Sequence, residues 1–189
     1  MQLNMKALAI ITGCTICADG RSHGQSVVDQ LQPLVAITAQ RLVIAEQVAL
    51  AKWDSGAPVE DVSREAQVIS DATKKAEARG LDQVSVSDFF KAQIEASKLV
   101  QYSSLAEWSR MGKAPDHNAI NLARSIRPKL DRVDTQLVSE LAKIESVRER
   151  ASCRVDIAKA VGKFVSTHRE SFRPLKAIAL DRALAVACR

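Results

Sequence analysis

Residues 33–53, PLVAITAQRLVIAEQVALAKW, decide the fold class, because their apolar side chains recur every three or four positions. Pro33 suits the first turn of a helix, where its missing N–H costs no hydrogen bond. The turn sequence DSGAP at residues 54–58 ends the segment. We therefore expect an amphipathic helix over residues 33–53.

The rest of the chain shows the same period, with turn residues between the periodic segments. Pro128 suits a first turn, Ser87 can cap a helix, and Gly80 and Gly112 are typical helix stops. No segment alternates as a half-buried strand would. The sequence therefore predicts an all-α protein, a helical bundle of about six helices. The five further helices are expected at residues 61–79, 88–110, 127–150, 153–166 and 174–187.

The composition narrows the function classes. With 189 residues, 47% hydrophobic and 26% charged, the chain is typical of globular proteins. The chain contains only 7 Gly, 5 Pro and 4% aromatic residues. This low content disfavours a β-sandwich or an α/β nucleotide-binding fold. The net charge of +5 is not gathered in a dense basic run, so it suits a small anionic ligand better than a phosphate backbone. We expect no nucleic-acid partner.

The first 18 residues have the layout of a signal peptide. Lys6 precedes an apolar run at residues 7–17, and Ala18 stands before polar residues. The run is too short to span a bilayer, so we expect residues 1–18 to be removed on export to the periplasm or medium, with no membrane contact afterwards. Two other interpretations stay open: a lipoprotein acylated at Cys14, and a cytosolic protein with an apolar start.

Removal of that segment leaves two cysteines, Cys153 and Cys188. In an oxidising compartment an even pair predicts one disulfide, here between the last two expected helices. In the chain-entropy model such a bond stabilises the fold by roughly 3 to 4 kcal/mol. The three histidines are scattered along the sequence, so we expect no zinc site and no other metal.

Two cations interrupt an otherwise apolar face of the first helix. Arg41 and Lys52 are 11 residues apart, which at roughly 100° per residue is three turns to within about 20°. Both therefore point the same way, and on a buried face they need an anionic partner. A solvated helix edge would fit the same spacing.

Further polar residues share faces on the next two helices. Asp61, Arg64 and Glu65 open the second helix, and Ser97 and Gln101 lie four residues apart on the third. Assembled in a bundle, these groups could line one pocket with the two cations of the first helix. Such a pocket would bind a small dianion. Taken singly, the same residues fit ordinary first-turn ion pairs and surface polar positions.

The order and spacing of these residues resemble the all-helical chorismate mutases of the AroQ class, in particular the exported gamma subclass. The matching segments are residues 41–53, 58–65 and 88–102. The resemblance covers residues 33–110 strongly and the C-terminal part more loosely, where the placement of the two cysteines also fits.

The resemblance implies a type II chorismate mutase fold in a single domain at residues 19–189. Its catalytic part would be the three helices at residues 33–110, followed by C-terminal helices at residues 118–189. It also implies a homodimer whose substrate is chorismate, rearranged to prephenate without a cofactor, metal or covalent intermediate. Such a pericyclic step needs a compact substrate conformer and stabilised negative charge on the breaking ether oxygen.

The resemblance also implies catalytic roles for four residues. Arg41 and Arg64 resemble the carboxylate clamps of the family, and Lys52 and Gln101 resemble the pair that hydrogen-bonds the ether oxygen. Neither Gln101 nor an ordinary lysine titrates between about pH 5 and 8. Activity should therefore not fall over that range.

Three further residues are expected to contact the substrate. Glu65 resembles the partner of the substrate hydroxyl, and Asp61 and Ser97 resemble additional pocket contacts. A different class of function stays open beside the enzyme, namely a non-enzymatic exported binding or effector module on the same scaffold.

One position departs from the family. Gln136 stands where at least one relative supplies another arginine from a later helix. Lys129 and Arg132 lie on a similar face and could replace that arginine, and the sequence does not decide among the three residues.

Overall fold

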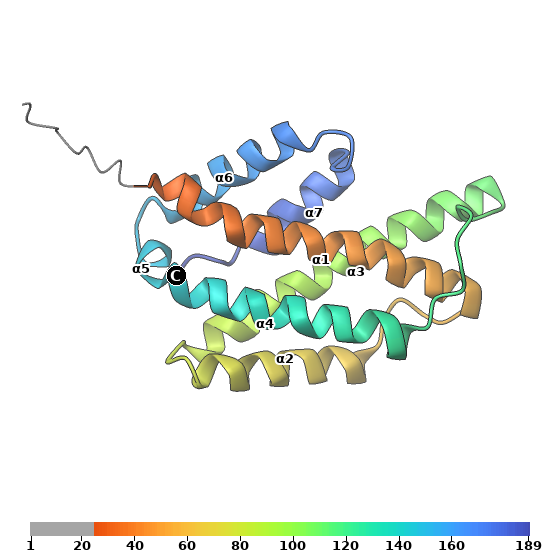
Figure 1. Ribbon diagram of the computed structural model, residues 1–189, viewed down its shortest axis with the longest axis horizontal. Coiled ribbons are helices and arrows are strands. Elements are labelled where there is room, and N and C mark those ends of the chain that lie inside the picture. The colour runs from red at the N-terminus through yellow and green to blue at the C-terminus, as the bar shows by residue number, and fades with distance from the viewer. Residues whose placement is uncertain (1–24) are drawn as a thin grey trace, which may run out of the picture.

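Seven α-helices and one π-helical turn follow one another along residues 25–189, the part of the chain that the computed structural model describes (Figure 1). The expectation of an all-α bundle is confirmed. The expected signal peptide and Cys14 lie outside the described residues. The helices are α1 Val27–Ser55, α2 Val62–Glu77, α3 Gln83–Met111, η1 Leu122–Ile126, α4 Arg127–Lys143, α5 Glu145–Arg148, α6 Cys153–Thr167 and α7 Pro174–Leu184.

Helix α1 begins earlier than expected, so Pro33 lies inside the helix and not in its first turn. Ser26 caps the N-terminus of α1, because its hydroxyl accepts a hydrogen bond from the backbone N–H of Asp29 at 3.1 Å. Leu31 and Leu34 are 0% exposed. Of these two, only Leu31 lies before the expected start; its burial contributes about 2 kcal/mol and the Ser26 cap about 1 kcal/mol, which together offset the roughly 3 kcal/mol that a proline costs inside a helix.

Two other helix boundaries differ from the sequence prediction. Helix α3 is capped by Asp82, whose carboxylate accepts from the N–H of Ser85 at 2.7 Å, and not by Ser87. The helix expected at residues 127–150 is interrupted at Ile144, between α4 and α5. This break lets both Ile144 and Val147 pack into the core, where they are 4% exposed.

Helix α1 is the central helix of the bundle. It packs against α3, α4, α6 and α7. In Figure 1, α6 and α7 lie on one side of it and α4 and α2 on the other, while α3 crosses behind. By length and composition alone α1 could cross a membrane, but most of its apolar stretch is buried among these helices. Its apolar surface is thus explained by the core.

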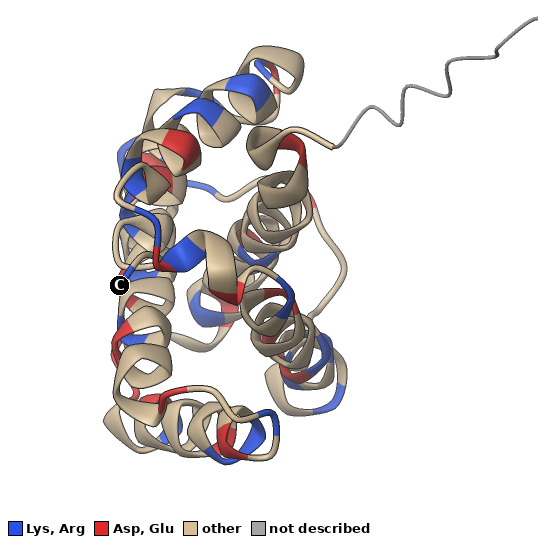
Figure 2. Ribbon diagram, turned by 90° about the vertical axis from the view of Figure 1, so that its left-hand side faces the viewer, with Lys and Arg blue, Asp and Glu red and all other residues tan. Residues whose placement is uncertain are grey.

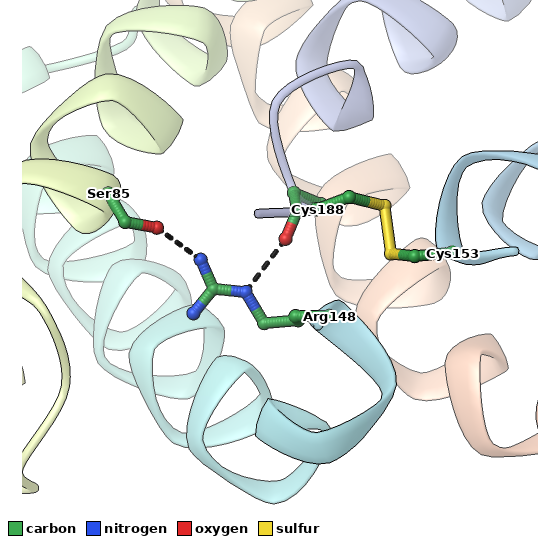
Figure 3. The surroundings of a disulfide bond; sticks show 5 residues. Ser85, Arg148, Cys153 and Cys188 are labelled. Carbon is green, nitrogen blue, oxygen red and sulfur yellow. Dashed lines mark hydrogen bonds between the residues drawn. A yellow bond between two sulfur atoms is a disulfide. The ribbon is translucent and has the colours of Figure 1, made fainter. Parts of the chain in front are cut away.

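A disulfide closes the C-terminal part of the bundle. Cys153 at the start of α6 is bonded to Cys188 beyond α7, as expected, with the two Cα atoms 5.9 Å apart. Beside this bond lies Arg148, which is 0% exposed and donates from Nε to the carbonyl of Ala187 at 2.7 Å (Figure 3). Its Nη2 donates to the hydroxyl of Ser85, so one side chain ties α5 to α3 and to the C-terminal segment.

Candidate functional site

One cavity between α1, α2, α3 and the beginning of α4 brings together the seven residues expected to bind or act on the substrate. Its volume is about 120 Å³. A cavity of roughly 150 Å³ holds a single benzene ring, so this volume is on the scale of a small-molecule site and not of a groove for a polymer. The predicted residues that line it are Arg41, Lys52, Asp61, Arg64, Glu65, Ser97 and Gln101.

Arg41 is the most deeply buried of the cationic residues that line the cavity, with 4% of its surface exposed. Its Nε donates to the carboxylate of Asp134 at 2.9 Å, and its Nη1 donates to the carbonyl of Gln93 at 2.9 Å and to the hydroxyl of Ser97. Its Nη2 makes no hydrogen bond within residues 25–189. The guanidinium therefore has a fixed plane and two N–H groups available to a ligand.

Lys52, in the last turn of α1, is half-buried at the same cavity. Its ammonium donates to the carbonyl of Val59 at 2.6 Å. Burial lowers the pKa of Lys52 below the ordinary lysine value, and the carboxylates of Asp61 and Glu65 oppose this shift. A partly dehydrated ammonium with free donors is well suited to a developing negative charge.

The start of α2 places two predicted residues at the cavity. Asp61 caps the helix by accepting from the N–H of Arg64 at 3.0 Å, and its other oxygen lies 3.5 Å from Nη2 of Arg127. The side chain of Arg64 is 19% exposed and donates to Asp131 of α4 at 2.6 Å. Arg64 is therefore more accessible to solvent than Arg41.

Glu65 is oriented by a lysine that the sequence analysis did not consider. Lys98 lies 3.4 Å from the carboxylate of Glu65 and 2.6 Å from that of Glu95. The hydrogen bond to Glu95, with smaller contributions from Glu65, raises the pKa of Lys98. Lys98 thus stays charged and holds Glu65 at the cavity wall.

Gln101 lines the cavity with unused hydrogen-bonding capacity. Its Nε2 donates to the carbonyl of Ser97 at 3.2 Å and keeps a second N–H. Its Oε1 is buried and has no hydrogen-bond partner in the described part of the chain. A buried amide oxygen without a partner is costly, which indicates a place where a ligand or water completes the site.

Helix α4 contributes residues that sequence reasoning missed or left undecided. None of Lys129, Arg132 and Gln136 lines the cavity, whereas Arg127, the first residue of α4, does. The sequence left the choice among those three residues open, and at the cavity the first turn of α4 instead supplies Arg127 and Leu130. The buried Asp134 was also missed.

Charges of both signs are interspersed along the helices in the view of Figure 2. Within residues 25–189, no three His, Cys, Asp or Glu side chains lie close enough together to hold a metal ion. At the cavity itself, by contrast, five cationic side chains line the wall with two carboxylates. A small anion fits this arrangement.

Comparisons with known proteins agree with this geometry. The family model described as chorismate mutase type II matches residues 32–102. The secreted chorismate mutase of Mycolicibacterium smegmatis is 36% identical over 159 residues, covering 84% of this chain and 86% of the relative. That of Mycobacterium tuberculosis is 28% identical over 152 residues, covering 80% and 74%.

Solved structures extend the likeness to the whole bundle. The chorismate mutase from Burkholderia phymatum has a TM-score of 0.81 and 41% identity, covering 86% of this chain and 98% of that one. The chorismate mutase from Burkholderia thailandensis has a TM-score of 0.79 and 36% identity, covering 84% and 99%. On this combined likeness of sequence and fold, the chain belongs to the type II chorismate mutase family.

Proposed function

We propose that the cavity binds chorismate and rearranges it to prephenate. The observation that carries this proposal is the convergence of cations from α1, α2 and α4 with an α3 amide on one small cavity. Chorismate carries two carboxylates and an ether oxygen that gains negative charge as its bond to carbon breaks. A cavity with this charge pattern favours the transition state over the free substrate.

Arginines hold the two carboxylates of the substrate in this proposal. Arg41 offers the two N–H groups of its Nη2 from a rigid position, and Arg64 approaches from the start of α2. Arg127 lies at the beginning of α4 and adds a third guanidinium at the cavity. Guanidinium groups match the planar geometry of carboxylates, so they fix the compact conformer in which the two reacting carbons meet.

Lys52 and Gln101 stabilise the ether oxygen. In the concerted step the carbon–oxygen bond breaks as the new carbon–carbon bond forms, with no proton transferred. The ammonium of Lys52 and the second N–H of Gln101 supply two hydrogen bonds where the charge develops. No general base or nucleophile is needed for this step.

The remaining predicted residues act around this centre. Glu65, held by Lys98, accepts from the substrate hydroxyl. The hydroxyl of Ser97 accepts a hydrogen bond from Arg41, and Asp61 caps α2 and lies near Arg127. Both residues therefore hold cationic groups in place, in addition to contacting the substrate.

The protein is exported, in keeping with its relatives named secreted chorismate mutases. We further propose that residues 1–18 are a cleaved signal peptide and that residues 19–189 form one domain, which assembles as a homodimer without membrane contact. Mass spectrometry of the exported protein tests the cleavage, and light scattering coupled to size-exclusion chromatography tests the dimer. A protein that retains residues 1–18, or elutes as a monomer at micromolar concentration, contradicts the corresponding statement.

Loss of chorismate absorbance with the purified mature protein tests the function. We expect turnover by the wild type and a loss of about 10²-fold or more in kcat/KM for Arg64→Ala, with the helical circular dichroism unchanged. A folded wild-type protein that does not convert chorismate would contradict the proposal and favour the non-enzymatic binding module.

A further inference from the structure

We infer that Asp134 is a positioning residue, whose carboxylate fixes the orientation in which Arg41 meets the substrate. This inference rests on the proposed function. Asp134 lies on α4, far from Arg41 in sequence, and is 5% exposed. Its Oδ1 accepts from Nε of Arg41 at 2.9 Å, and both side chains of the pair are almost completely buried.

The bond to Asp134 completes a three-point attachment of the guanidinium. Two of the three partners, the carbonyl of Gln93 and the hydroxyl of Ser97, lie on α3 and bind Nη1. Asp134 alone binds Nε, and it does so from α4. Bonds from two helices to two different nitrogens prevent rotation of the planar group, so Nη2 keeps one direction toward the cavity.

Stability does not explain why a carboxylate occupies this position. Asp134 lies on the same face of α4 as the apolar residues Leu130, Leu137 and Leu141. A buried ion pair contributes little net stability, because the desolvation of both charges offsets their attraction. A carboxylate also reduces the local positive charge, which disfavours a dianionic ligand. Its remaining advantage is the fixed direction of Arg41, which matters because small displacements of a substrate-binding group lower the rate strongly.

Three substitutions separate orientation from charge. Asp134→Asn keeps an oxygen within hydrogen-bonding distance of Nε of Arg41 but removes the negative charge. Asp134→Glu keeps the charge but displaces the oxygen, and Asp134→Ala removes both the oxygen and the charge. We expect kcat/KM within about threefold of wild type for Asn and losses of about tenfold or more for Glu and Ala. The KM of the Asn variant should not rise, because the cavity becomes more positive.

Glu140 supplies the matched control. It lies on the same helix, is 9% exposed, and pairs with Lys143 at 2.6 Å, without lining the cavity. Glu140→Ala should therefore keep wild-type kcat/KM in the folded protein. A loss equal to that of Asp134→Ala would show that any buried charge on α4 matters equally, and would overturn the inference.

A measurement independent of turnover follows the Arg41 side chain itself. In ¹H–¹⁵N spectra, the Nε–H signal of Arg41, assigned by its disappearance in Arg41→Lys, should be protected from solvent exchange in the wild type and in Asp134→Asn. It should lose protection in Asp134→Glu. Arg148, whose Nε–H is bonded to the carbonyl of Ala187, gives an internal reference that should not change.

The outcomes distinguish this inference from the proposed function. A wild type that does not turn over chorismate contradicts the function, while the exchange measurement still tests the attachment of Arg41. Retained protection and kcat/KM in Asp134→Glu, or equal losses for Asn and Glu, would overturn the inference. If Asp134→Ala does not fold, the Asn and Glu pair decides the question alone.

Discussion

Two buried arginines in this molecule have different surroundings. Arg148, near the disulfide, is 0% exposed and uses Nε, Nη1 and Nη2 for bonds to Ala187, Glu145 and Ser85. Arg41, at the cavity, is 4% exposed and uses only Nε and Nη1 for bonds within the described chain. Burial is thus similar, and the difference is the nitrogen that remains available.

The difference shows how a structural arginine and a binding arginine can be told apart. A buried guanidinium whose nitrogens are all bonded to the protein stabilises the fold, because each bond satisfies a backbone or side-chain acceptor. A guanidinium with some nitrogens bonded to the protein and another nitrogen unbonded can donate from that nitrogen to a ligand. Substitutions at the two positions should therefore separate activity from stability.

The largest effect is expected for Arg41→Ala, which should lower kcat/KM for chorismate by about 10³-fold. The measurement is the initial rate of chorismate absorbance loss. Because the alanine variant leaves Asp134 as an unpaired buried carboxylate, Arg41→Lys is the companion variant. It keeps the positive charge but not the planar fork, so its kcat/KM should still fall at least about tenfold. Wild-type activity in the folded lysine variant would remove the distinction between the two arginines.

The disulfide beside Arg148 should affect stability and leave activity unchanged. Cys153→Ser with Cys188→Ser releases a loop with a sequence separation of 35, which corresponds to about 4 kcal/mol in the chain-entropy model. Urea unfolding of the oxidised wild type and the double variant measures this difference. At a temperature where both are folded, kcat/KM should agree within about twofold. A selective loss of activity would show that the C-terminal region also supports the cavity.

Arg148→Met should give a smaller loss of stability, about 2 to 3 kcal/mol. Methionine fills part of the volume but leaves the carbonyl of Ala187 buried without its donor. The unfolding midpoint in urea should fall, while the kcat/KM of the folded variant stays within about twofold of wild type. An unchanged midpoint would mean that the hydrogen bonds of Arg148 do not stabilise the C-terminal segment.

Arg41 also shows which parts of the site could be predicted from the sequence. Helical spacing placed Arg41 on an otherwise apolar face, left a solvated edge open, and required an anionic partner only if that face was buried. Arg41 is buried, and Asp134 partly meets that requirement. The partner itself was missed because it lies 93 residues away, and no local spacing connects α1 to α4. A signal existed, since Asp134 interrupts the apolar stripe of its helix as Arg41 interrupts its own.

Helix boundaries show the same limit. Pro33 and Ser87 are good local start signals, but burial of Leu31 and Val86 extends both helices beyond them. Arg127 was passed over for a related reason. Its role depends on where the N-terminal end of α4 meets the cavity, which follows from packing and not from the sequence near it.

The smallest effect is expected from pH. Wild-type kcat/KM should change by less than about twofold between pH 5 and 8, because Gln101 does not titrate and an ordinary lysine stays protonated in that range. Above this range activity should fall as Lys52 loses its proton, and at a lower pH than for a free lysine, because burial lowers its pKa. Burial also lowers the pKa of Arg148, but an arginine stays charged throughout, so the C-terminal region adds no pH dependence.

Gln101→Glu is the matched variant for the pH profile. Its new carboxyl group can donate to the ether oxygen only when protonated, so kcat/KM should decline as pH rises from 5 to 8 while the wild type stays level. The difference between the two profiles isolates the neutral amide as the donor at the cavity. A steep decline of the wild type over the same interval would instead place a titrating group in the cavity, and would remove Gln101 from the proposed reaction.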